Sequence, residues 1–261
     1  MIACMNHGRA RCRLLFCTTV VVAAIICTVW LAQPRQPAAD SVPLAVVELF
    51  TSQGCSSCPP ADALLGELTA RPDVLALSFH VDYWNYIGWA DPYPDPAFTR
   101  RQRAYAEVMN ARYVYTPQLV INGRHHVSGA DRSEFNRHLN EASQRPATSV
   151  AIDQAGDDLL HIVIPRHAGG DPATIWLALY DPRHETAVRA GENRGRRLVN
   201  YNVVREFRRI GAWPGEPLEM NVAAQRGGSG QAEGPPRRGA AILLQSLRTG
   251  QIVGAGRLAA P

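Results

Sequence analysis

The pair Cys55 and Cys58 stands between a short apolar run and a helical pattern, and this junction limits the possible folds more than any other feature of the chain. The run Leu44–Phe50 has the length and composition of a buried strand, and Thr51–Gly54 has the composition of a loop. Two prolines follow Cys58 and fit only near a helix start, because proline donates no backbone hydrogen bond. Leucines at helical spacing come next. We therefore predict the order strand, loop, cysteine pair, helix.

The residues that follow continue this alternation of strands and helices. A second apolar run, Val74–Val81, comes after the helix, and a strand–helix–strand unit implies a right-handed parallel crossover. Asn122-Gly123 is a hairpin-turn sequence, and Asp131 is a suitable N-cap for a last helix. We assign residues 44–146 to an α/β domain with a central mixed sheet flanked by helices. Its further predicted elements are a helix at Ala97–Ala111, strands at Tyr113–Asn122 and His125–Ser128, and a helix ending at Ala142.

After residue 146 the pattern changes to short alternating apolar segments separated by turns. We predict that residues 147–261 form a second, β-rich domain of sandwich type. Two polar motifs in it, Gly191–Gly195 and Asn200–Asn202, are expected to brace the contact between the two domains. The predicted strands lie at Val150–Ile152, Leu159–Ile164, Thr174–Tyr180, Leu198–Val204, Leu218–Val222, Ala240–Leu247 and Gln251–Val253.

The N-terminal segment has the pattern of an export signal. Three arginines among the first 13 residues precede an uncharged stretch of 19 residues, 14–32, which would span about 28 Å as a helix. This length is closer to a membrane span than to a signal-peptide core, and no convincing cleavage site follows. We favour a signal anchor in residues 1–32 over a cleaved signal peptide, with a linker at 33–43. The body would then be periplasmic or secreted, and anchored to the inner membrane if the signal stays uncleaved.

The charge of the exported part argues against a nucleic-acid partner. The whole chain carries a net charge of +4, but without residues 1–32 it has 24 basic and 23 acidic residues. A nearly neutral body does not attract nucleic acid. No motif indicates an oligomeric state.

The distribution of cysteines favours a reactive pair over a structural framework. Four of the six cysteines lie in the N-terminal segment, and only Cys55 and Cys58 lie in the body. Two cysteines make no framework for a body of this size, and a bridge between them closes too small a loop to stabilise the fold much. Two alternatives stay open. One is an inert disulfide, and the other is half of a metal site completed by His80, His125 or His126.

A strand-to-helix junction gives the two cysteines different roles in thiol–disulfide exchange. The first lies near free backbone N–H groups, and the positive end of the helix dipole favours its thiolate, which is the nucleophile. The second lies one turn away. We therefore predict that Cys55 attacks and Cys58 resolves the mixed disulfide. No cofactor is implied, and the expected partner is a protein or small-molecule thiol or disulfide.

Thr116-Pro117 is the second chemical feature of the sequence. It stands before an apolar run that ends in the Asn-Gly turn. A cis bond at Pro117 is our expectation, and a trans proline at the first residue of a strand is the alternative.

The order of these features resembles the thioredoxin superfamily over roughly residues 44–142. The segment Glu48–Asp62, together with His80–Trp84, Val114–Gln118 and Asn202–Val204, is similar to the motifs of an uncharacterised family of bacterial secreted proteins, a domain of unknown function with a thioredoxin-like fold. The resemblance implies a thiol-redox fold in which a cis-proline faces the dithiol and the residue before it pairs with the substrate. Thr116 and Pro117 would then bind substrate. The resemblance supplies no established substrate.

The sequence departs from ordinary thioredoxins in ways that weaken the first thiolate. Gly54 replaces the tryptophan that precedes the first cysteine, and the spacer is Ser-Ser. The two prolines leave fewer regular N–H groups near Cys55, and Asp62 adds a negative charge. We therefore expect the pKa of the Cys55 thiol to be only modestly lowered.

An aromatic loop follows the second strand and contains Trp84 and Trp89. It is expected at the edge of the sheet that holds the dithiol, where it would form a lid or a groove for a substrate peptide. Packing against the β-rich domain is the equal alternative. His80 and Asp82 end the same strand and are candidates for a proton relay, although His80 is as easily explained as a core histidine.

Three functions fit these observations. The leading one is an extracytoplasmic thiol–disulfide oxidoreductase that uses Cys55 and Cys58. The second is a binding module without redox activity, which would hold copper through both cysteines and one histidine if it handles a metal. The third is a structural protein of the cell envelope that binds through its β-rich region.

Overall fold

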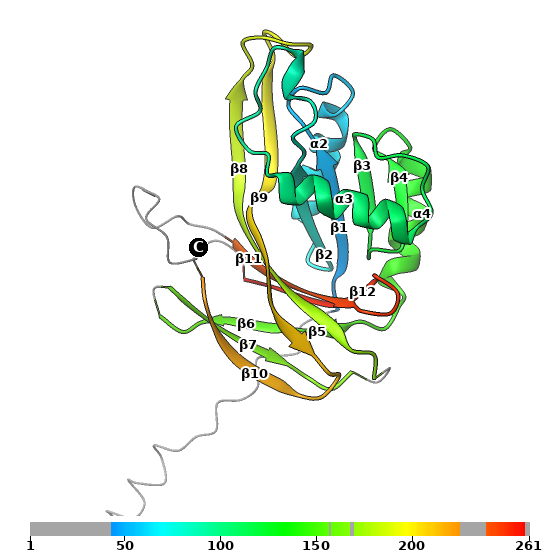
Figure 1. Ribbon diagram of the computed structural model, residues 1–261, viewed down its shortest axis with the longest axis vertical. Helices are drawn as coiled ribbons and strands as arrows, with labels where there is room; N and C mark the ends of the chain where they lie inside the picture. The colour runs from blue at the N-terminus through cyan, green and yellow to red at the C-terminus, as the bar shows by residue number, and fades with distance from the viewer. Residues whose placement is uncertain (1–42, 157, 168–169, 225–238, 259–261) are drawn as a thin grey trace, which may run out of the picture. The chain divides into compact units, whose positions relative to one another are not determined.

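The computed structural model describes residues 43–156, 158–167, 170–224 and 239–258, which form a mixed α/β fold (Figure 1). The signal predicted at residues 1–32 lies outside the described part, as does the linker except for Pro43. Within the described residues, no helix combines the length and the apolar character that a bilayer crossing requires.

The large sheet has nine strands and mixes parallel with antiparallel neighbours, in the order β4-β3-β1-β2-β9-β8-β11-β12-β5. Strand β1 (Ala45–Thr51) is parallel to β2 (Val74–His80), as the crossover predicts, and antiparallel to β3 (Gln118–Ile121). The other strands of this sheet are β4 (His125–Ser128), β5 (Thr148–Ser149), β8 (Ala173–Ala187), β9 (Arg197–Trp213), β11 (Gly239–Ser246) and β12 (Ile252–Leu258).

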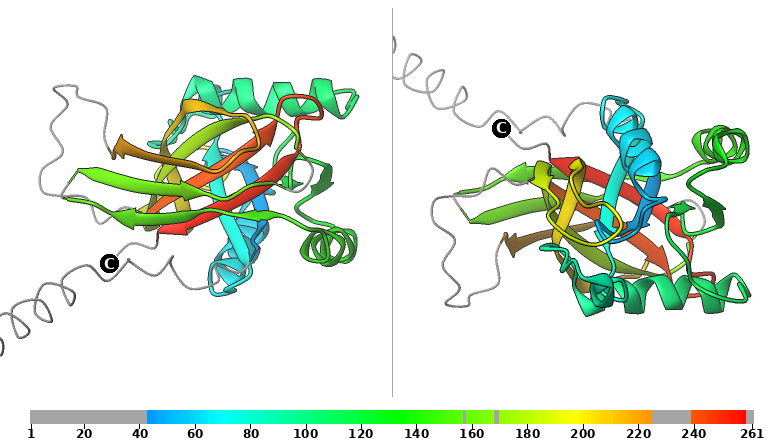
Figure 2. Two further views of the ribbon diagram at one scale, coloured as in Figure 1. Left: turned by 90° about the horizontal axis from the view of Figure 1, so that it is seen from below. Right: turned by 90° about the horizontal axis from the view of Figure 1, so that it is seen from above.

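In the described part of the chain, three α-helices cover the half of this sheet that contains β1 and β2. Alternate side chains of β1 point to opposite faces: Val47 and Leu49 pack with α2 and α4, whereas Val46 and Phe50 pack with α3. Figure 2 shows α3 on one side of the sheet and α2 and α4 on the other. The helices are α2 (Pro59–Thr69), α3 (Pro96–Val108) and α4 (Arg132–Ser143), with a short 3-10 turn, η1, at Asn85–Ile87.

A second sheet of three strands packs on the other half of the large sheet. Its strands are in the order β10-β7-β6, and apolar side chains of β7 such as Ile162 share a core with Ile175 of β8 and Ile242 of β11. The sandwich description of this region stays a prediction. The bounds are β6 (Ala151–Gln154), β7 (Leu159–Ile164) and β10 (Leu218–Ala223).

The large sheet continues across the domain boundary that we placed after residue 146. Strand β9 pairs with β2 in parallel, with Val203 opposite Ser78. Strands β8 and β9 have 15 and 17 residues, about twice the length of the strands predicted there. Their extra residues are largely polar and half exposed, so no apolar alternation marks them. Because β8 and β9 are long, the connection between them reaches the loop that contains the cysteine pair.

The strand predicted at Tyr113–Asn122 is too long. Only Gln118–Ile121 forms β3, and the residues before it are irregular. Pro117 has no N–H for a strand ladder, and the carbonyl of Tyr115 accepts a hydrogen bond from the side-chain amide of Gln102 at 2.8 Å. The carbonyl of Tyr115 thus bonds to α3, and the carbonyl of Pro117 accepts from the N–H of Gly129, directly after β4.

Candidate functional site

The cysteine pair lies in the tight connection from β1 to α2. The hydroxyl of Ser52 accepts from the N–H of Gly54, and its carbonyl accepts from the N–H of Cys55. Cys55 and Cys58 form a disulfide, with their Cα atoms 5.4 Å apart. The predicted order of strand, loop, cysteine pair and helix is therefore confirmed.

Helix α2 starts with an unusual shortage of donors. Cys58 is the N-cap, and the two residues after it are prolines without N–H groups. The first helical donors are Ala61 and Asp62, and both bond to the carbonyl of Cys58, at 2.9 and 3.1 Å. Because Pro59 and Pro60 have no N–H groups, the start of the helix offers few donors to Cys55. This agrees with the weak stabilisation that we expect for the Cys55 thiolate.

Both sulfur-bearing residues are covered. Cys55 is 1% exposed and Cys58 is 0% exposed, whereas Ser56 and Ser57 between them are exposed. The hydroxyl of Ser57 lies 3.3 Å from the sulfur of Cys55. A reagent that attacks the disulfide must therefore displace part of the surrounding structure.

The tip of the β8–β9 hairpin braces the cysteine loop. The buried amide of Asn193 donates to the carbonyls of Gln53 and Cys55, at 2.9 Å each, and the carboxylate of Glu192 accepts from the N–H of Ser56. The side chain of Gln53 donates to Asn200 at 3.0 Å. The two polar motifs of the C-terminal region thus brace this loop, as expected for a contact between the N- and C-terminal parts.

Trp84 links the cysteine loop to Thr116-Pro117. Its indole N–H donates to the hydroxyl of Thr116 at 2.7 Å, and a Cβ placed on Gly54 would lie 3.1 Å from the Cβ of Trp84. The Thr116–Pro117 bond is cis, as predicted. The structure therefore brings the cysteines, Trp84 and Thr116-Pro117 together.

The rest of the aromatic loop partly faces the cysteine loop and partly packs against the β-rich region, so both alternatives that we considered apply. Trp89 faces the cysteine loop, because its indole N–H donates to the side-chain carbonyl of Gln53 at 3.2 Å. The loop also touches the C-terminal part, since Tyr93 lies within hydrogen-bonding distance of Thr186. Tyr86 is 81% exposed.

His80 pairs with Asp91 and not with Asp82. The imidazole Nδ1 donates to the Asp91 carboxylate at 2.7 Å, and both side chains are fully buried. Burial alone would raise the pKa of Asp91, but the charge of His80 and the N–H groups of Gln53 and Tyr93 hold it below its ordinary value. Asp82 accepts a hydrogen bond from the hydroxyl of Thr99 and faces α3. The structure therefore joins Asp91 to the site and leaves Asp82 outside it.

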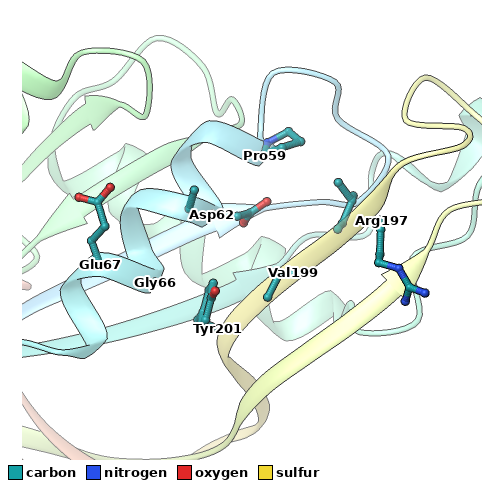
Figure 3. Close-up of a pocket in the computed structure, with 9 residues that line it drawn as sticks. Pro59, Asp62, Gly66, Glu67, Arg197, Val199 and Tyr201 are labelled. Atoms are coloured by element: carbon teal, nitrogen blue, oxygen red, sulfur yellow. The ribbon is translucent and has the colours of Figure 1, made fainter.

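Asp62 lies one helical turn beyond Cys58 and is 4% exposed. Burial raises the pKa of its carboxyl from 3.8 to about 7, against the opposing effect of the His80 charge. This raised pKa reduces the negative charge that we expected Asp62 to add near Cys55. Asp62 lines a pocket of about 400 Å³ between α2 and β9, shared with Glu67, Arg197 and Tyr201 (Figure 3).

A comparison with protein families places the chain. A family model described as "Protein of unknown function (DUF1223)" matches residues 46–245. The chain belongs to the DUF1223 family. The match includes the cysteine loop, Asp62, Asp91 and Asn193, so the DUF1223 region contains the whole site described above.

One solved structure resembles this DUF1223 chain closely. It is the X-ray crystal structure of a protein from Agrobacterium tumefaciens, determined by a structural genomics consortium, with 33% identity and a TM-score of 0.72 over 85% of this chain and 97% of that chain. A domain of the outer membrane lipoprotein Omp28 from Porphyromonas gingivalis also matches, at 10% identity and a TM-score of 0.23 over 42% of this chain and 83% of that chain. The search of curated proteins gives no match.

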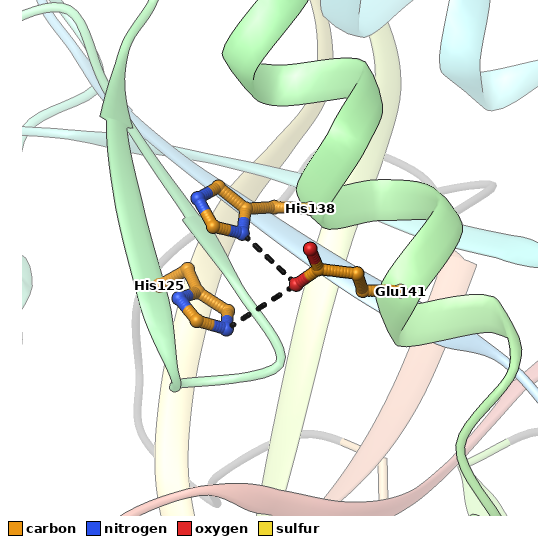
Figure 4. A group of neighbouring side chains, drawn as sticks. All are labelled: His125, His138 and Glu141. Atoms are coloured by element: carbon orange, nitrogen blue, oxygen red, sulfur yellow. Dashed lines mark hydrogen bonds and ion pairs between the residues drawn. The ribbon is translucent and has the colours of Figure 1, made fainter.

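Of the histidines that we considered as metal ligands, His80 lies near the cysteine loop but pairs with Asp91, whereas His125 lies apart from the cysteines. In the described residues of this DUF1223 chain, His125, His138 and Glu141 bring ligand atoms within 4.8 Å of one another (Figure 4). His125 of β4 pairs with Ile121 of β3, and Ile121 pairs with Val47 of β1. Val47 lies near the start of β1, and the cysteine loop follows the other end of this strand. The imidazoles of His125 and His138 are stacked, 4.0 Å apart at 15°. An imidazole binds a metal in the plane of its ring, so the stacked pair cannot share one ion as it stands.

Sequence reasoning missed Asp91 as part of the DUF1223 site, and it assigned Asn193 and Asn200 only to a contact between the two parts of the chain. Asp91 bonds His80 and the N–H of Gln53, the Gln53 side chain bonds Asn200, and Asn193 bonds the cysteine loop. Two observations in the sequence were available. Asp91 lies among the prolines after the aromatic loop, and Asn193 lies between two glycines. Both glycines, Gly191 and Gly195, adopt positive φ and shape the hairpin tip.

Proposed function

We propose that this protein is an extracytoplasmic thiol–disulfide oxidoreductase with a thioredoxin-like domain. The observation that carries the proposal is the Cys55–Cys58 disulfide at the start of α2, with the buried carboxyl of Asp62 one turn away. A disulfide between cysteines three positions apart adds little to stability, so its value lies in chemistry.

The thioredoxin-like reading has support from the arrangement of β1 to β4 and the three helices. The parallel pair β1 and β2 flanks α2, β3 and β4 return antiparallel, and helices lie on both faces. Pro117 packs near the start of α2, because a Cβ on Gly129 would meet both Pro117 and Ala61 within 3.0 Å. This arrangement puts the cis-proline segment beside the cysteine pair.

The reduced protein would reduce a substrate disulfide, and its own dithiol would become a disulfide. The Cys55 thiolate attacks one substrate sulfur, a Cys55–substrate disulfide forms, and the other substrate sulfur leaves as a thiolate that takes up a proton. Cys58 then loses its proton and attacks Cys55. The Cys55–Cys58 disulfide forms and the second substrate thiol leaves. Run in reverse, the same steps would oxidise a substrate dithiol.

The substrate would enter beside Trp84, with Thr116-Pro117 holding its backbone and Trp89 forming part of the wall. Tyr86 is exposed at the same loop and adds apolar surface. Entry requires the Asn193 side chain to release the carbonyls of Gln53 and Cys55. We propose a protein or small-molecule thiol or disulfide as substrate, in the periplasm or outside the cell, with the N-terminal segment as signal or anchor.

The test is the redox equilibrium of the purified protein with glutathione, combined with an insulin-reduction assay. We expect a reversible two-electron exchange and insulin reduction that the Cys55→Ser variant loses. A disulfide that stays intact both in reduced glutathione and in excess dithiothreitol would contradict the proposal. Full insulin reduction by the Cys55→Ser variant would contradict it as well.

The burial of both cysteines favours a second candidate, a binding module that keeps its disulfide closed. Such a module would bind its partner through the same face. The glutathione equilibrium separates the two candidates, because a binding module shows no exchange while its fold is intact.

A further inference from the structure

The first residues of β9 have an edge that the described strands leave open. On one side, Arg197 and the residues after it pair with β8. On the other side, the pairing with β2 is confined to Val203, opposite Ser78. The stretch from Arg197 to Tyr201 therefore has a strand neighbour on one side only, within the part of the chain that the structure describes. Backbone groups along such an edge can bond to another chain.

The hydrogen bonds of the β8–β9 hairpin identify the backbone groups that face this edge. The N–H of Val188 donates to the carbonyl of Arg196 at 3.0 Å, so the backbone of Arg196 faces β8. Along an antiparallel pair, residues that bond to the partner strand alternate with residues whose N–H and C=O groups point away from it. Arg197, Val199 and Tyr201 therefore present their backbone groups to the open edge.

The pocket beside α2 lies along this edge. It has a volume of about 400 Å³, and its lining includes Arg197, Val199 and Tyr201 from β9 and Pro59 from α2 (Figure 3). This volume is in the usual range of ligand sites in proteins. Because Pro59 directly follows Cys58, the pocket extends from the open edge to the neighbourhood of the disulfide.

The charged side chains that line the pocket are largely compensated. Glu67 forms an ion pair with Arg132, and Arg197 donates to Glu185 at 2.8 Å. Burial raises the pKa of the Asp62 carboxyl to about 7, which reduces its charge. A pocket with balanced charges beside free backbone groups suits an uncharged ligand that both donates and accepts hydrogen bonds. The backbone of an extended polypeptide is such a ligand.

Helix α2 stands close to β9 and limits what can add to the edge. A Cβ placed on Gly66 would meet the ring of Tyr201 at 2.6 Å, so the helix and the strand touch beside the pocket. A strand that belongs to a folded sheet brings its neighbouring strand with it, about 4.8 Å away. A single extended chain needs no such space, which favours it over the sheet edge of a second folded molecule.

We propose that the open edge of β9 binds an extended polypeptide as an added strand, with side chains of that polypeptide in the pocket beside α2. The inference rests on the proposed oxidoreductase function and names its substrate class, an unfolded or extended protein chain held by its backbone next to the cysteine pair. Main-chain recognition of this kind tolerates many sequences. The site is distinct from Thr116-Pro117, since neither residue lines the pocket.

Isothermal titration calorimetry on the purified protein in its disulfide form tests the site without any redox step. The probe is the insulin B chain with carboxamidomethylated cysteines, which cannot exchange with a disulfide. We expect Val199→Pro to weaken binding about tenfold or more, because it removes a backbone donor from the open edge and adds a ring there. Ala187→Pro is the matched control. Ala187 lies opposite Arg197 on β8, so its N–H faces the other edge of the hairpin, and binding should stay within about twofold of wild type.

Two further measurements separate loss of the site from a folding defect. Ala63→Phe changes an exposed residue of α2 that lines the pocket, so it should weaken binding while β9 stays unaltered. In the wild-type protein, the amide hydrogens of Val199 and Tyr201 should exchange rapidly with solvent and become protected when the probe binds.

The outcomes distinguish the site from the proposed function. No binding, or equal binding by wild type and Val199→Pro, would overturn the inference, and the function would stand if glutathione still exchanges with the disulfide. Binding that Val199→Pro abolishes, in a protein whose disulfide never exchanges, would support the site and contradict the function. If a second copy of this chain occupies the edge, the wild-type protein sediments as a dimer that Val199→Pro dissociates, and that result overturns the proposal of a polypeptide substrate.

Discussion

Two buried charged clusters flank the paired strands β1 and β2, and they differ in how completely they are hydrogen bonded. On the α3 face, the guanidinium of Arg101 donates to both oxygens of Glu48, at 2.6 and 3.1 Å, and Tyr105 donates to the same carboxylate. At the cysteine end, Asp62 and His80 are equally buried, and the described residues offer no hydrogen-bond partner to Nε2 of His80. The first cluster ties α3 to β1, and the second is less completely paired within the described residues.

The comparison teaches that burial of charge alone does not mark a functional site. Arg101 also lies over the rings of Phe207 and Tyr105, 4.3 and 4.9 Å from their centroids, so its charge is compensated on every side. A cluster of this kind is structural. Incomplete pairing next to the Cys55–Cys58 disulfide is what distinguishes the Asp62 cluster.

The largest expected effect comes from breaking the fully paired cluster. Arg101→Met leaves the Glu48 carboxylate buried without its partner and should lower the free energy of unfolding by about 3–5 kcal/mol. Urea unfolding measures the loss. Adding Glu48→Gln to the same chain should restore much of it, since no unpaired charge then remains. A loss below about 1 kcal/mol for the single variant would show that the cluster does not hold α3.

The second effect is the pH dependence of stability that Asp62 imposes. Its raised pKa means that the folded protein holds this proton more tightly than the unfolded chain, so stability falls as the pH rises from about 4 through about 7. Asp62→Asn removes this dependence and should stabilise the oxidised protein at pH 8 by on the order of 2–4 kcal/mol. Parallel urea unfolding at pH 5 and pH 8 checks the sign. Equal pH dependence in both proteins would refute the raised pKa.

A smaller effect should follow from loosening the hairpin tip over the disulfide. Asn193→Ala removes two hydrogen bonds to the cysteine loop, worth about 1–3 kcal/mol together, and should speed reduction by dithiothreitol about tenfold. Asn202→Gly is the matched control, because it removes an Asn bond to the carbonyl of Ala76 and suits the positive φ there. An unchanged rate for Asn193→Ala would mean that the tip does not limit access.

The smallest effect concerns the link between the aromatic loop and the cis-proline segment. Trp84→Phe keeps most of the packing and loses the hydrogen bond to Thr116, worth about 1 kcal/mol, so kcat/KM for a disulfide substrate should fall about fivefold. Trp176→Phe is the control, since the indole N–H of Trp176 has no partner in the described part of the chain. Equal effects of both changes would assign Trp84 to packing alone.

The sequence was sufficient for the local structure around the cysteines and insufficient for the side chains that surround them. Strand, loop, helix and parallel crossover follow from short-range patterns of apolar residues, prolines and turns. Asp91 and Asn193 reach the cysteine loop from 38 and 138 residues away along the chain. Polar contacts of that range leave no periodicity, and only the length and register of β8 and β9 bring Asn193 into place.

The most direct test of the central claim is to trap the mixed disulfide. The Cys58→Ser variant is reacted with oxidised glutathione, and the adduct is located by mass spectrometry. If Cys55 attacks and Cys58 resolves, a glutathione adduct on Cys55 accumulates in this variant, and neither the wild-type protein nor Cys55→Ser retains one. An adduct that forms mainly on Cys58 in the Cys55→Ser variant, or a Cys55 thiol that stays unmodified in the folded protein and reacts only in denaturant, would contradict the account.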